Sequence, residues 1–188
     1  MAKVIMFNLI SLDGYFEGAQ KWDLAWHRVD EEFNQFAIAQ LDRADGLLFG
    51  RVTYEGMAAY WSSAEAISSD PEVASRMNSI RKYVFTRTLD RVAWNNTQLV
   101  KGDAVELLTR LKRQPGRDLL LFGSADLAAT FTRHGLIDEY RIMVIPVILG
   151  AGGPLFNKIE GLLKLQLLET KTFRNGNVLL NYAPGERN

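Results

Sequence analysis

Residues 46–53 read Gly-Leu-Leu-Phe-Gly-Arg-Val-Thr, an apolar run closed by a glycine and followed by a helix start. A short apolar run of this kind is typical of a buried strand, and residues 53–60 predict the next helix. The order is repeated at residues 119–122, where Gly123-Ser124 separates an apolar strand from a helix with the buried stripe Leu127, Ala128 and Phe131. Repeated strand, glycine and helix units predict an α/β fold with a largely parallel sheet.

The segments before and between these units predict the same alternation. Residues 3–12 are an apolar strand that stops at Asp13-Gly14, and residues 30–43 carry Phe33, Phe36, Ala37 and Leu41 at helical spacing. Residues 82–86 are a further strand. Two more helices are predicted from their caps: one capped by Asp70 that runs from Pro71 to about Ser79, and one with a variant capping box of Asp103 and Glu106 that ends at Pro115-Gly116.

The C-terminal third changes to strands alone. Residues 139–149, 163–173 and 177–182 have the composition of strands, and Asn175-Gly176 joins the last two as a hairpin. They predict an antiparallel edge on the mostly parallel sheet. No repeat, low-complexity tract or long linker divides the chain, so residues 1–188 are interpreted as one domain.

Composition narrows the possible chemistry. The 188 residues contain no cysteine, which excludes disulfides, thiolate nucleophiles and cysteine-based metal sites. Lys+Arg and Asp+Glu both number 22, so the overall charge gives no reason to expect nucleic-acid or acidic-membrane binding. Residues 1–10 read as a strand rather than a signal peptide, and no run of about 18 apolar residues occurs. We therefore expect a cytoplasmic enzyme.

Three turns after predicted strands combine glycine, hydroxyl and cation. Ligands of open α/β sheets bind outside the carboxyl ends of the strands, where free amides at helix starts favour anions. The turns are Gly50-Arg51-Val52-Thr53, Thr86-Arg87 and Gly123-Ser124. Each one alone is also explained as an ordinary turn with a solvated side chain, but together they indicate a phosphate-binding edge.

Several familiar motifs are excluded. Glycines 150, 152 and 153 do not form a dinucleotide-binding fingerprint, because the next required glycine position is Leu155 and Pro154 replaces a clean helix start. They are interpreted as a turn between strands that can still press on a ligand. His27 and His134 lack metal-ligand spacing, so no metal site is predicted, and His134 is interpreted as a helix end.

Asp13 and Asp23 are the acids of the early segment that stand among aromatic residues. A carboxylate in an aromatic cleft can hold a protonated heterocycle or supply a proton. Alternatively Asp13 caps a turn and Asp23 caps a helix, and the sequence leaves both interpretations open. The aromatic residues around them are Tyr15, Phe16, Trp22 and Trp26.

Five segments carry a resemblance to a known family. They are Ser11–Gly14, Gly46–Glu55, Val84–Arg87, Phe122–Ser124 and Pro146–Gly152. In their order and spacing the chain resembles the dihydrofolate-reductase-like superfamily, in particular the reductase domain of bacterial riboflavin biosynthesis and its stand-alone relatives. The resemblance covers nearly the whole chain. It implies a three-layer α/β/α fold with a mostly parallel central sheet and an antiparallel C-terminal edge.

The resemblance also implies a function. The implied function is the NADPH-dependent reduction of a small heterocycle, in particular a pyrimidine of the 5-amino-6-(5-phosphoribosylamino)uracil type, by hydride transfer to the opened ribose carbon. A homodimer is expected. The implied site has Gly50, Arg51 and Thr53 at the cofactor phosphates, Thr86 and Arg87 near the 2′-phosphate, Phe122, Gly123 and Ser124 at the pyrophosphate, Asp13 facing nicotinamide and substrate, and Trp22, Trp26, Pro146 and Gly150 on the substrate side.

Two alternatives remain. Asp23-Leu24-Ala25-Trp26 looks like the segment around the folate-binding acid of dihydrofolate reductases, which would make Asp23 a proton-supplying carboxylate and the substrate a dihydrofolate or pterin. The stretch from Asp23 to Gly50 is longer than that family's pattern. The second alternative, from another class, is a nucleotide-binding protein without turnover.

Overall fold

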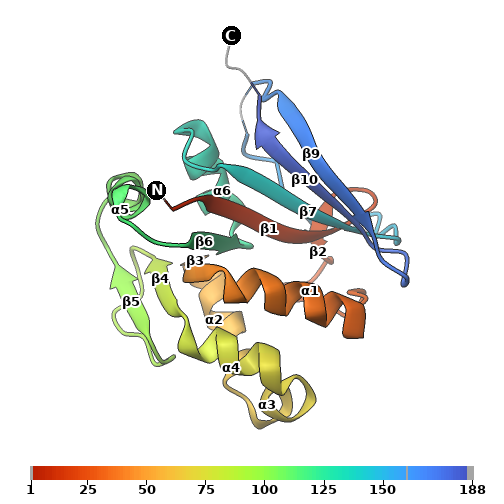
Figure 1. Cartoon of the computed structure of the whole chain (residues 1–188), viewed down its shortest axis with the longest axis horizontal. Coiled ribbons are helices and arrows are strands. Elements are labelled where there is room, and N and C mark those ends of the chain that lie inside the picture. Colours follow the sequence, from red (N-terminus) through yellow and green to blue (C-terminus); the bar gives the residue numbers. More distant parts are fainter. Residues whose placement is uncertain (1, 160, 186–188) are drawn as a thin grey trace.

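The computed structural model describes residues 2–159 and 161–185. Its centre is an eight-stranded sheet of order β5-β4-β3-β6-β1-β7-β10-β9 (Figure 1). β10 runs antiparallel to both of its neighbours, β7 and β9, and all the other neighbouring pairs are parallel. The predicted parallel sheet with an antiparallel C-terminal edge is confirmed. The strands are β1 (Val4–Ser11), β3 (Ala44–Gly50), β4 (Arg81–Phe85), β5 (Thr97–Val100), β6 (Asp118–Phe122), β7 (Glu139–Ile145), β9 (Leu165–Thr172) and β10 (Val178–Pro184).

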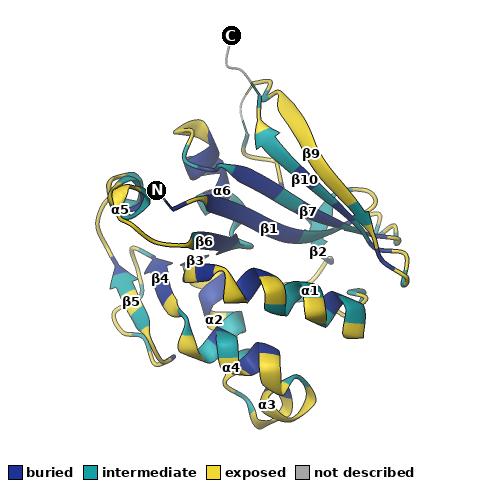
Figure 2. Cartoon of the chain, in the orientation of Figure 1, coloured by how far each residue is buried: buried dark blue, intermediate teal, exposed yellow. Residues whose placement is uncertain are grey.

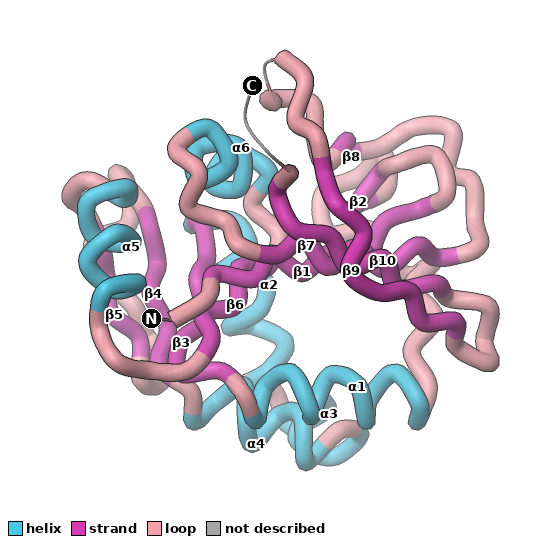
Figure 3. Tube along the Cα trace, turned by 45° about the horizontal axis from the view of Figure 1, so that its top comes forward, coloured by secondary structure: helices cyan, strands magenta, loops and turns pink. Residues whose placement is uncertain are grey.

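Helices cover both faces of the sheet, as the alternation of buried side chains requires. Ile5 packs in one core with helices α1, α2 and α4, whereas the next residue, Met6, packs in the core that includes α5 and α6. Figure 3 shows α1, α3 and α4 together on one side of the sheet and α6 on the other. The fold is thus the expected three-layer α/β/α fold. Its helices are α1 (Glu31–Asp42), α2 (Arg51–Trp61), α3 (Ala64–Ser69), α4 (Pro71–Ser79), α5 (Ala104–Arg113) and α6 (Ala125–Arg133).

Local capping explains where two helices begin. The Asp30 carboxylate accepts a hydrogen bond from the Phe33 amide at 2.9 Å, and the Asp103 carboxylate accepts from the Val105 and Glu106 amides. The predicted cap by Asp70 is wrong. Its carboxylate instead accepts a hydrogen bond from Asn34 Nδ2 on α1 at 2.6 Å, so it ties α4 to α1.

The predicted strand over 139–149 is too long. β7 ends at Ile145 because Pro146 has no N–H for the ladder, and residues 146–150 form a loop at the carboxyl end of the sheet. Four short elements were not predicted: α3, β5, and the strands β2 (Tyr15–Glu17) and β8 (Gly153–Pro154), which form a separate two-stranded sheet. Each is too short to carry a clear periodicity.

Burial is highest in the middle of the sheet and lowest at the β9 edge (Figure 2). β1, β3 and β6 supply side chains without solvent exposure, such as Ile5, Leu48 and Leu121. In contrast, Leu165, Leu167 and Leu168 of β9 are 41%, 52% and 50% exposed. No helix of the described residues has the length and apolar character needed to cross a membrane.

The connections of the sheet diverge between β3 and β6. β3 continues through α2, α3 and α4 to β4 on one side, whereas β6 continues through α6 to β7 on the other side. Adjacent parallel strands whose connections diverge in this way define the switch point at which open α/β sheets bind ligands.

Candidate active site

Two glycine turns meet at this switch point. The Gly50 amide, which directly precedes α2, donates a hydrogen bond to Ser124 Oγ at 2.8 Å. Ser124 Oγ also lies 2.8 Å from Thr53 Oγ1, so the first turn of α2 and the turn before α6 are joined through one hydroxyl. In the sequence Ser124 is 74 positions from Gly50 and 71 from Thr53, and the structure brings the two turns together. That this edge binds phosphate stays a prediction.

The two glycines permit this close approach. A Cβ at Gly50 would lie 2.7 Å from Ser124 Oγ, and a Cβ at Gly123 would lie 2.9 Å from the Thr53 side chain. Gly123 has φ +54°, and Ser124, the residue before α6, has the same left-handed φ. The Ser124 hydroxyl therefore does not cap its own helix but faces the neighbouring turn.

Asn8 of β1 supports the Gly123 turn, and the sequence analysis missed it. Its Oδ1 accepts a hydrogen bond from the Gly123 amide at 2.7 Å, and the residue is 5% exposed. Its Nδ2 is buried without a hydrogen-bond partner among the described residues. A polar residue within the apolar run of residues 4–10 was the available signal.

The polar and cationic side chains of the site differ in how many of their donors are already hydrogen-bonded. Arg51 is held by Glu55 one helical turn later, with Nη1 3.1 Å from Glu55 Oε2. Thr86 Oγ1 accepts from the Thr88 and Leu89 amides and keeps its own hydrogen to donate. The exposed side chain of Arg87 makes no hydrogen bond or ion pair within residues 2–159 and 161–185. Arg87 is therefore the cation whose charge is most available to a ligand.

Asp13 anchors the loop after β7. Its two carboxylate oxygens accept hydrogen bonds from the Leu149 amide at 3.1 Å and the Gly150 amide at 2.7 Å. Hydrogen bonding to Ser11, together with these two amides, lowers the pKa of Asp13 to about 2. Asp13 and Gly150, both expected at the site, are thus in direct contact, and the Asp13 carboxyl is ionised at neutral pH.

Asp23 and the two tryptophans lie in the segment before α1. The Asp23 carboxylate folds against Gly18, where a Cβ would lie 2.1 Å from its Oδ2. Trp22 lies against α2, because a Cβ at Gly56 would meet its indole at 2.0 Å. Trp26 donates from Nε1 to the Asp23 carbonyl at 3.0 Å. The structure brings Trp22 to the helix that follows Gly50, whereas the exposed Asp23 side chain lies beside Gly18 of its own loop.

Two expected site residues have mainly packing contacts. The Phe122 ring lies 6.1 Å from that of Phe7 and 6.0 Å from that of Phe49. Pro146 is exposed and lies near Gly176, where a Cβ would be 3.3 Å from its Cγ.

The glycines after residue 149 form the turn that the sequence predicts. Gly153 pairs with Glu17, and a Cβ at Gly152 would lie 2.2 Å from the Glu17 carbonyl oxygen. His134 ends α6 as expected, and Gly135 follows with φ +64°. Among the described residues no group of three or more His, Cys, Asp or Glu side chains could hold a metal ion.

The turns have the chemistry that a dinucleotide phosphate requires. They offer two glycines that allow close approach, the hydroxyls of Thr53 and Ser124, the first-turn amides of α2 and α6, and the cation of Arg87. Two surface hollows lie at the other end of the sheet, at the amino ends of the strands, and none of these residues lines them. The carboxyl-end turns remain the better candidate site because their hydroxyl, amide and cationic groups converge there.

The fold defines a dihydrofolate-reductase-like α/β protein, with two joined glycine turns at its switch point. The chain belongs to the RibD C-terminal domain family, whose model matches residues 2–179.

Relatives and solved structures agree with this membership. YyaP of Bacillus subtilis, an uncharacterized protein, is 32% identical over 96% of this chain and 94% of its own length. The 2,5-diamino-6-ribosylamino-4(3H)-pyrimidinone 5′-phosphate reductase of Aquifex aeolicus is 24% identical over 87% of this chain and 88% of its own.

Among solved structures, a Shewanella sp. PV-4 protein assigned to riboflavin biosynthesis has a TM-score of 0.77 and 26% identity, covering 99% of this chain and 100% of that one. The fold is also that of dihydrofolate reductase from Enterococcus faecalis, with a TM-score of 0.66, 13% identity and coverage of 98% and 97%.

Proposed function

We propose that this protein is an NADPH-dependent reductase of a small nitrogen heterocycle, in particular a pyrimidine of the 5-amino-6-(5-phosphoribosylamino)uracil type. The observation that carries the proposal is the joined pair of glycine turns at the switch point between β3 and β6. Membership of the RibD C-terminal domain family supports a reductase whose substrate resembles those of riboflavin biosynthesis. Bound NADPH would supply the hydride.

The chain's own residues would bind and orient the cofactor. The first-turn amides of α2, with the one hydroxyl hydrogen that the bond between Thr53 and Ser124 leaves free, offer donors for phosphate oxygens. Asn8 fixes the Gly123 turn from below, so these donors stay in place before the ligand arrives. Thr86 and Arg87 follow the neighbouring strand β4 and would take the 2′-phosphate that distinguishes NADPH from NADH.

Asp13 would act on the substrate side by positioning rather than by donating a proton. Its pKa of about 2 keeps the carboxyl ionised at neutral pH, so it has no proton to give. It fixes the loop of residues 146–150 through the Leu149 and Gly150 amides. An ionised carboxylate beside this loop can also accept a hydrogen bond from an amino or hydroxyl group of the substrate.

The pyrimidine substrate is favoured over dihydrofolate by the position of Asp23. A folate-type reaction needs a carboxylate held toward the heterocycle, whereas the Asp23 carboxylate is exposed beside Gly18 and has no hydrogen-bond partner among the described residues to orient it. The name of the Aquifex aeolicus relative, a reductase of a ribosylaminopyrimidinone 5′-phosphate, supports the same substrate class.

Turnover with defined substrates tests the proposal. Purified protein is mixed with NADPH and either 5-amino-6-(5-phosphoribosylamino)uracil or dihydrofolate, and the loss of nicotinamide absorbance is followed. We expect oxidation with the pyrimidine, and a lower kcat/KM in Asp13→Asn because a donor amide replaces one acceptor oxygen. Turnover of dihydrofolate alone, abolished in Asp23→Asn, would favour the folate alternative. NADPH binding without turnover of either substrate would indicate a nucleotide-binding protein.

A further inference from the structure

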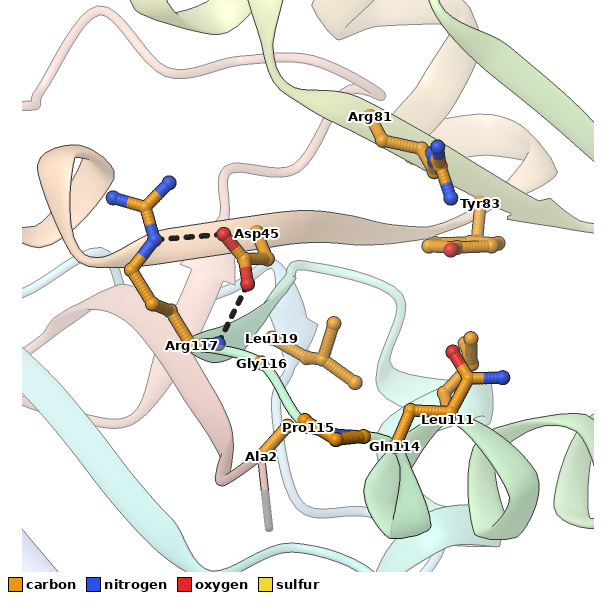
Figure 4. Close-up of a pocket in the computed structure, with 10 residues that line it drawn as sticks. All are labelled: Ala2, Asp45, Arg81, Tyr83, Leu111, Gln114, Pro115, Gly116, Arg117 and Leu119. Carbon is orange, nitrogen blue, oxygen red and sulfur yellow. Dashed lines mark hydrogen bonds and ion pairs between the residues drawn. The ribbon is translucent and has the colours of Figure 1, made fainter.

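A cavity opens at the opposite end of the sheet from the glycine turns. It lies at the amino ends of β3, β4 and β6 beside the end of α5, and its volume is about 360 Å³ (Figure 4). This volume is in the range of small-molecule sites. None of the residues assigned above to cofactor or substrate lines it. The proposed reductase activity therefore gives this cavity no role.

The floor of the cavity is apolar and aromatic. Tyr83 and Leu119 are each 5% exposed, and Leu111 of α5 adds a third apolar side chain. Tyr83 and Leu119 both lie against Gly46, where a Cβ would be 3.1 Å and 2.9 Å from them. Because Gly46 has no side chain, the ring and the leucine can lie close to the strand. A flat apolar group can lie on this floor.

The charges at the rim are unequal. The Asp45 carboxylate is fully engaged by Arg117, with 2.6 Å from the Arg117 amide and 2.7 Å from its Nε (Figure 4). Arg117 Nη1 donates to the Asp42 carbonyl at 2.7 Å, so this guanidinium is held in place. Arg81, which contacts Tyr83 on the other side of the cavity, has no carboxylate partner among the described residues. The lining thus carries one positive charge more than negative charge.

We propose that this cavity binds a small organic anion, an aromatic ring that carries a carboxylate or a phosphate. The ring lies on Tyr83 and Leu119, and the oxyanion is bound by Arg81, whose planar fork of donors suits both groups. The Gln114 side chain at the rim adds an amide that can donate to the anion or accept from a ring substituent. The proposal does not depend on the reductase activity.

A titration followed by amide resonances tests the proposal. Nitrogen-15-labelled protein is titrated with phenyl phosphate and with benzoate, and in parallel with inorganic phosphate and with benzyl alcohol. We expect saturable shifts at the amides of Tyr83, Gly116 and Leu119 with both aromatic anions. The tighter of the two identifies the preferred oxyanion. Benzyl alcohol, which has the ring without the charge, and inorganic phosphate, which has the charge without the ring, should each bind at least about tenfold more weakly. Each of them lacks one of the two contacts.

Two variants separate this site from general anion binding. Arg81→Gln should lower the affinity for the aromatic anions by about tenfold or more. The matched control Arg113→Gln changes an exposed arginine outside the cavity and should leave that affinity unchanged. Gln114→Trp adds a bulky side chain at the rim and should also reduce binding. Unchanged affinity in Arg81→Gln, equal binding of benzyl alcohol, or shifts confined to Gly50 and Gly123 would each overturn the proposal. The last result would place the anions at the cofactor site.

Discussion

Gly123 has a conformation and a packing environment that only glycine fits without strain. Its φ of +54° is costly for a residue with a side chain, and a Cβ there would press on Thr53 at 2.9 Å. The amide that this conformation presents is fixed by Asn8 Oδ1. A single methyl group therefore disturbs both turns of the site at once.

We predict that Gly123→Ala destabilises the protein by about 1–2 kcal/mol and weakens NADPH binding by roughly tenfold or more. The matched control is Gly102→Ala, since a Cβ at Gly102 meets nothing within 4 Å. Urea unfolding and a fluorescence titration with NADPH measure the two effects. Equal affinities of the two variants would show that the Gly123 turn does not contact the cofactor.

His27 makes stability depend on pH. Burial lowers the pKa of its imidazole from 6.5 to about 4, and Nε2 is buried without a partner among the described residues. Between pH 6.5 and 4 the unfolded chain binds a proton at His27 that the folded protein does not. The free energy of unfolding must therefore fall as the pH is lowered through this window, by up to about 3 kcal/mol at its lower end.

The variant His27→Leu should lack this part of the pH dependence. Urea unfolding of both proteins at pH 7 and pH 4.5 measures the difference. A wild-type protein that loses no more stability than His27→Leu between these pH values would contradict the buried, neutral imidazole.

At the scale of the elements, the sequence predicted those segments whose local signals agree with their tertiary contacts. The strands β3 and β6, the helix start at Pro71 and the cap by Asp103 follow from apolar runs and capping residues alone. The Asp70 cap failed because Asn34, a residue of another helix, binds the same carboxylate. Such competition between partners distant in the chain leaves no local pattern.

The candidate site was predicted to a similar extent. The glycine turns and Asp13 were found because turns after strands have a recognisable composition. Asn8 was missed because one polar residue did not change the interpretation of its apolar strand. The joining of Gly50, Thr53 and Ser124 through one hydroxyl depends on the pairing of β3 with β6, which only the fold reveals.

β4 contains a fully buried lysine whose partners are all backbone carbonyls. Lys82 Nζ donates to the carbonyls of Asn78, Ile80 and Asn95 at 2.8–3.1 Å, and it lies 4.4 Å from the centre of the Trp94 ring. These bonds tie the end of α4 and the loop before β5 to the strand. The lysine thus holds the β4–β5 edge of the sheet together.

Lys82→Met should lower the free energy of unfolding by about 3 kcal/mol, because a side chain of similar length leaves buried carbonyls without a donor. The control is Lys101→Met, an exposed lysine paired with Asp90. Urea unfolding measures both variants. A loss in Lys82→Met no larger than in the control would show that water replaces the ammonium without cost.

At the scale of the whole molecule, β9 is an edge strand with an unusual surface. Its leucines at 165, 167 and 168 are exposed, and no other strand of the described residues covers its outer side (Figure 2). Free backbone groups beside apolar side chains are a common site of strand pairing between chains. We propose that a second copy of the chain covers this edge in a homodimer, as the family resemblance implies.

We expect the wild-type protein to sediment as a dimer and Leu168→Lys to sediment mainly as a monomer. The control Leu162→Lys changes an even more exposed leucine, at 87%, that lies outside β9 and should leave the dimer intact. Sedimentation velocity at several concentrations measures both. A wild-type protein that stays monomeric throughout would contradict the proposed assembly.

The most direct test of the proposed reductase is a fluorescence titration of the protein with NADPH and, separately, with NADH, because Trp22 packs against α2, the helix that starts at the proposed phosphate site. The account predicts saturable binding of NADPH and a preference over NADH of about ten- to a hundredfold that is lost in Arg87→Ala, while the neighbouring exposed Arg91→Ala keeps it. Binding of neither nucleotide would contradict the account, since the joined glycine turns would then serve the fold alone.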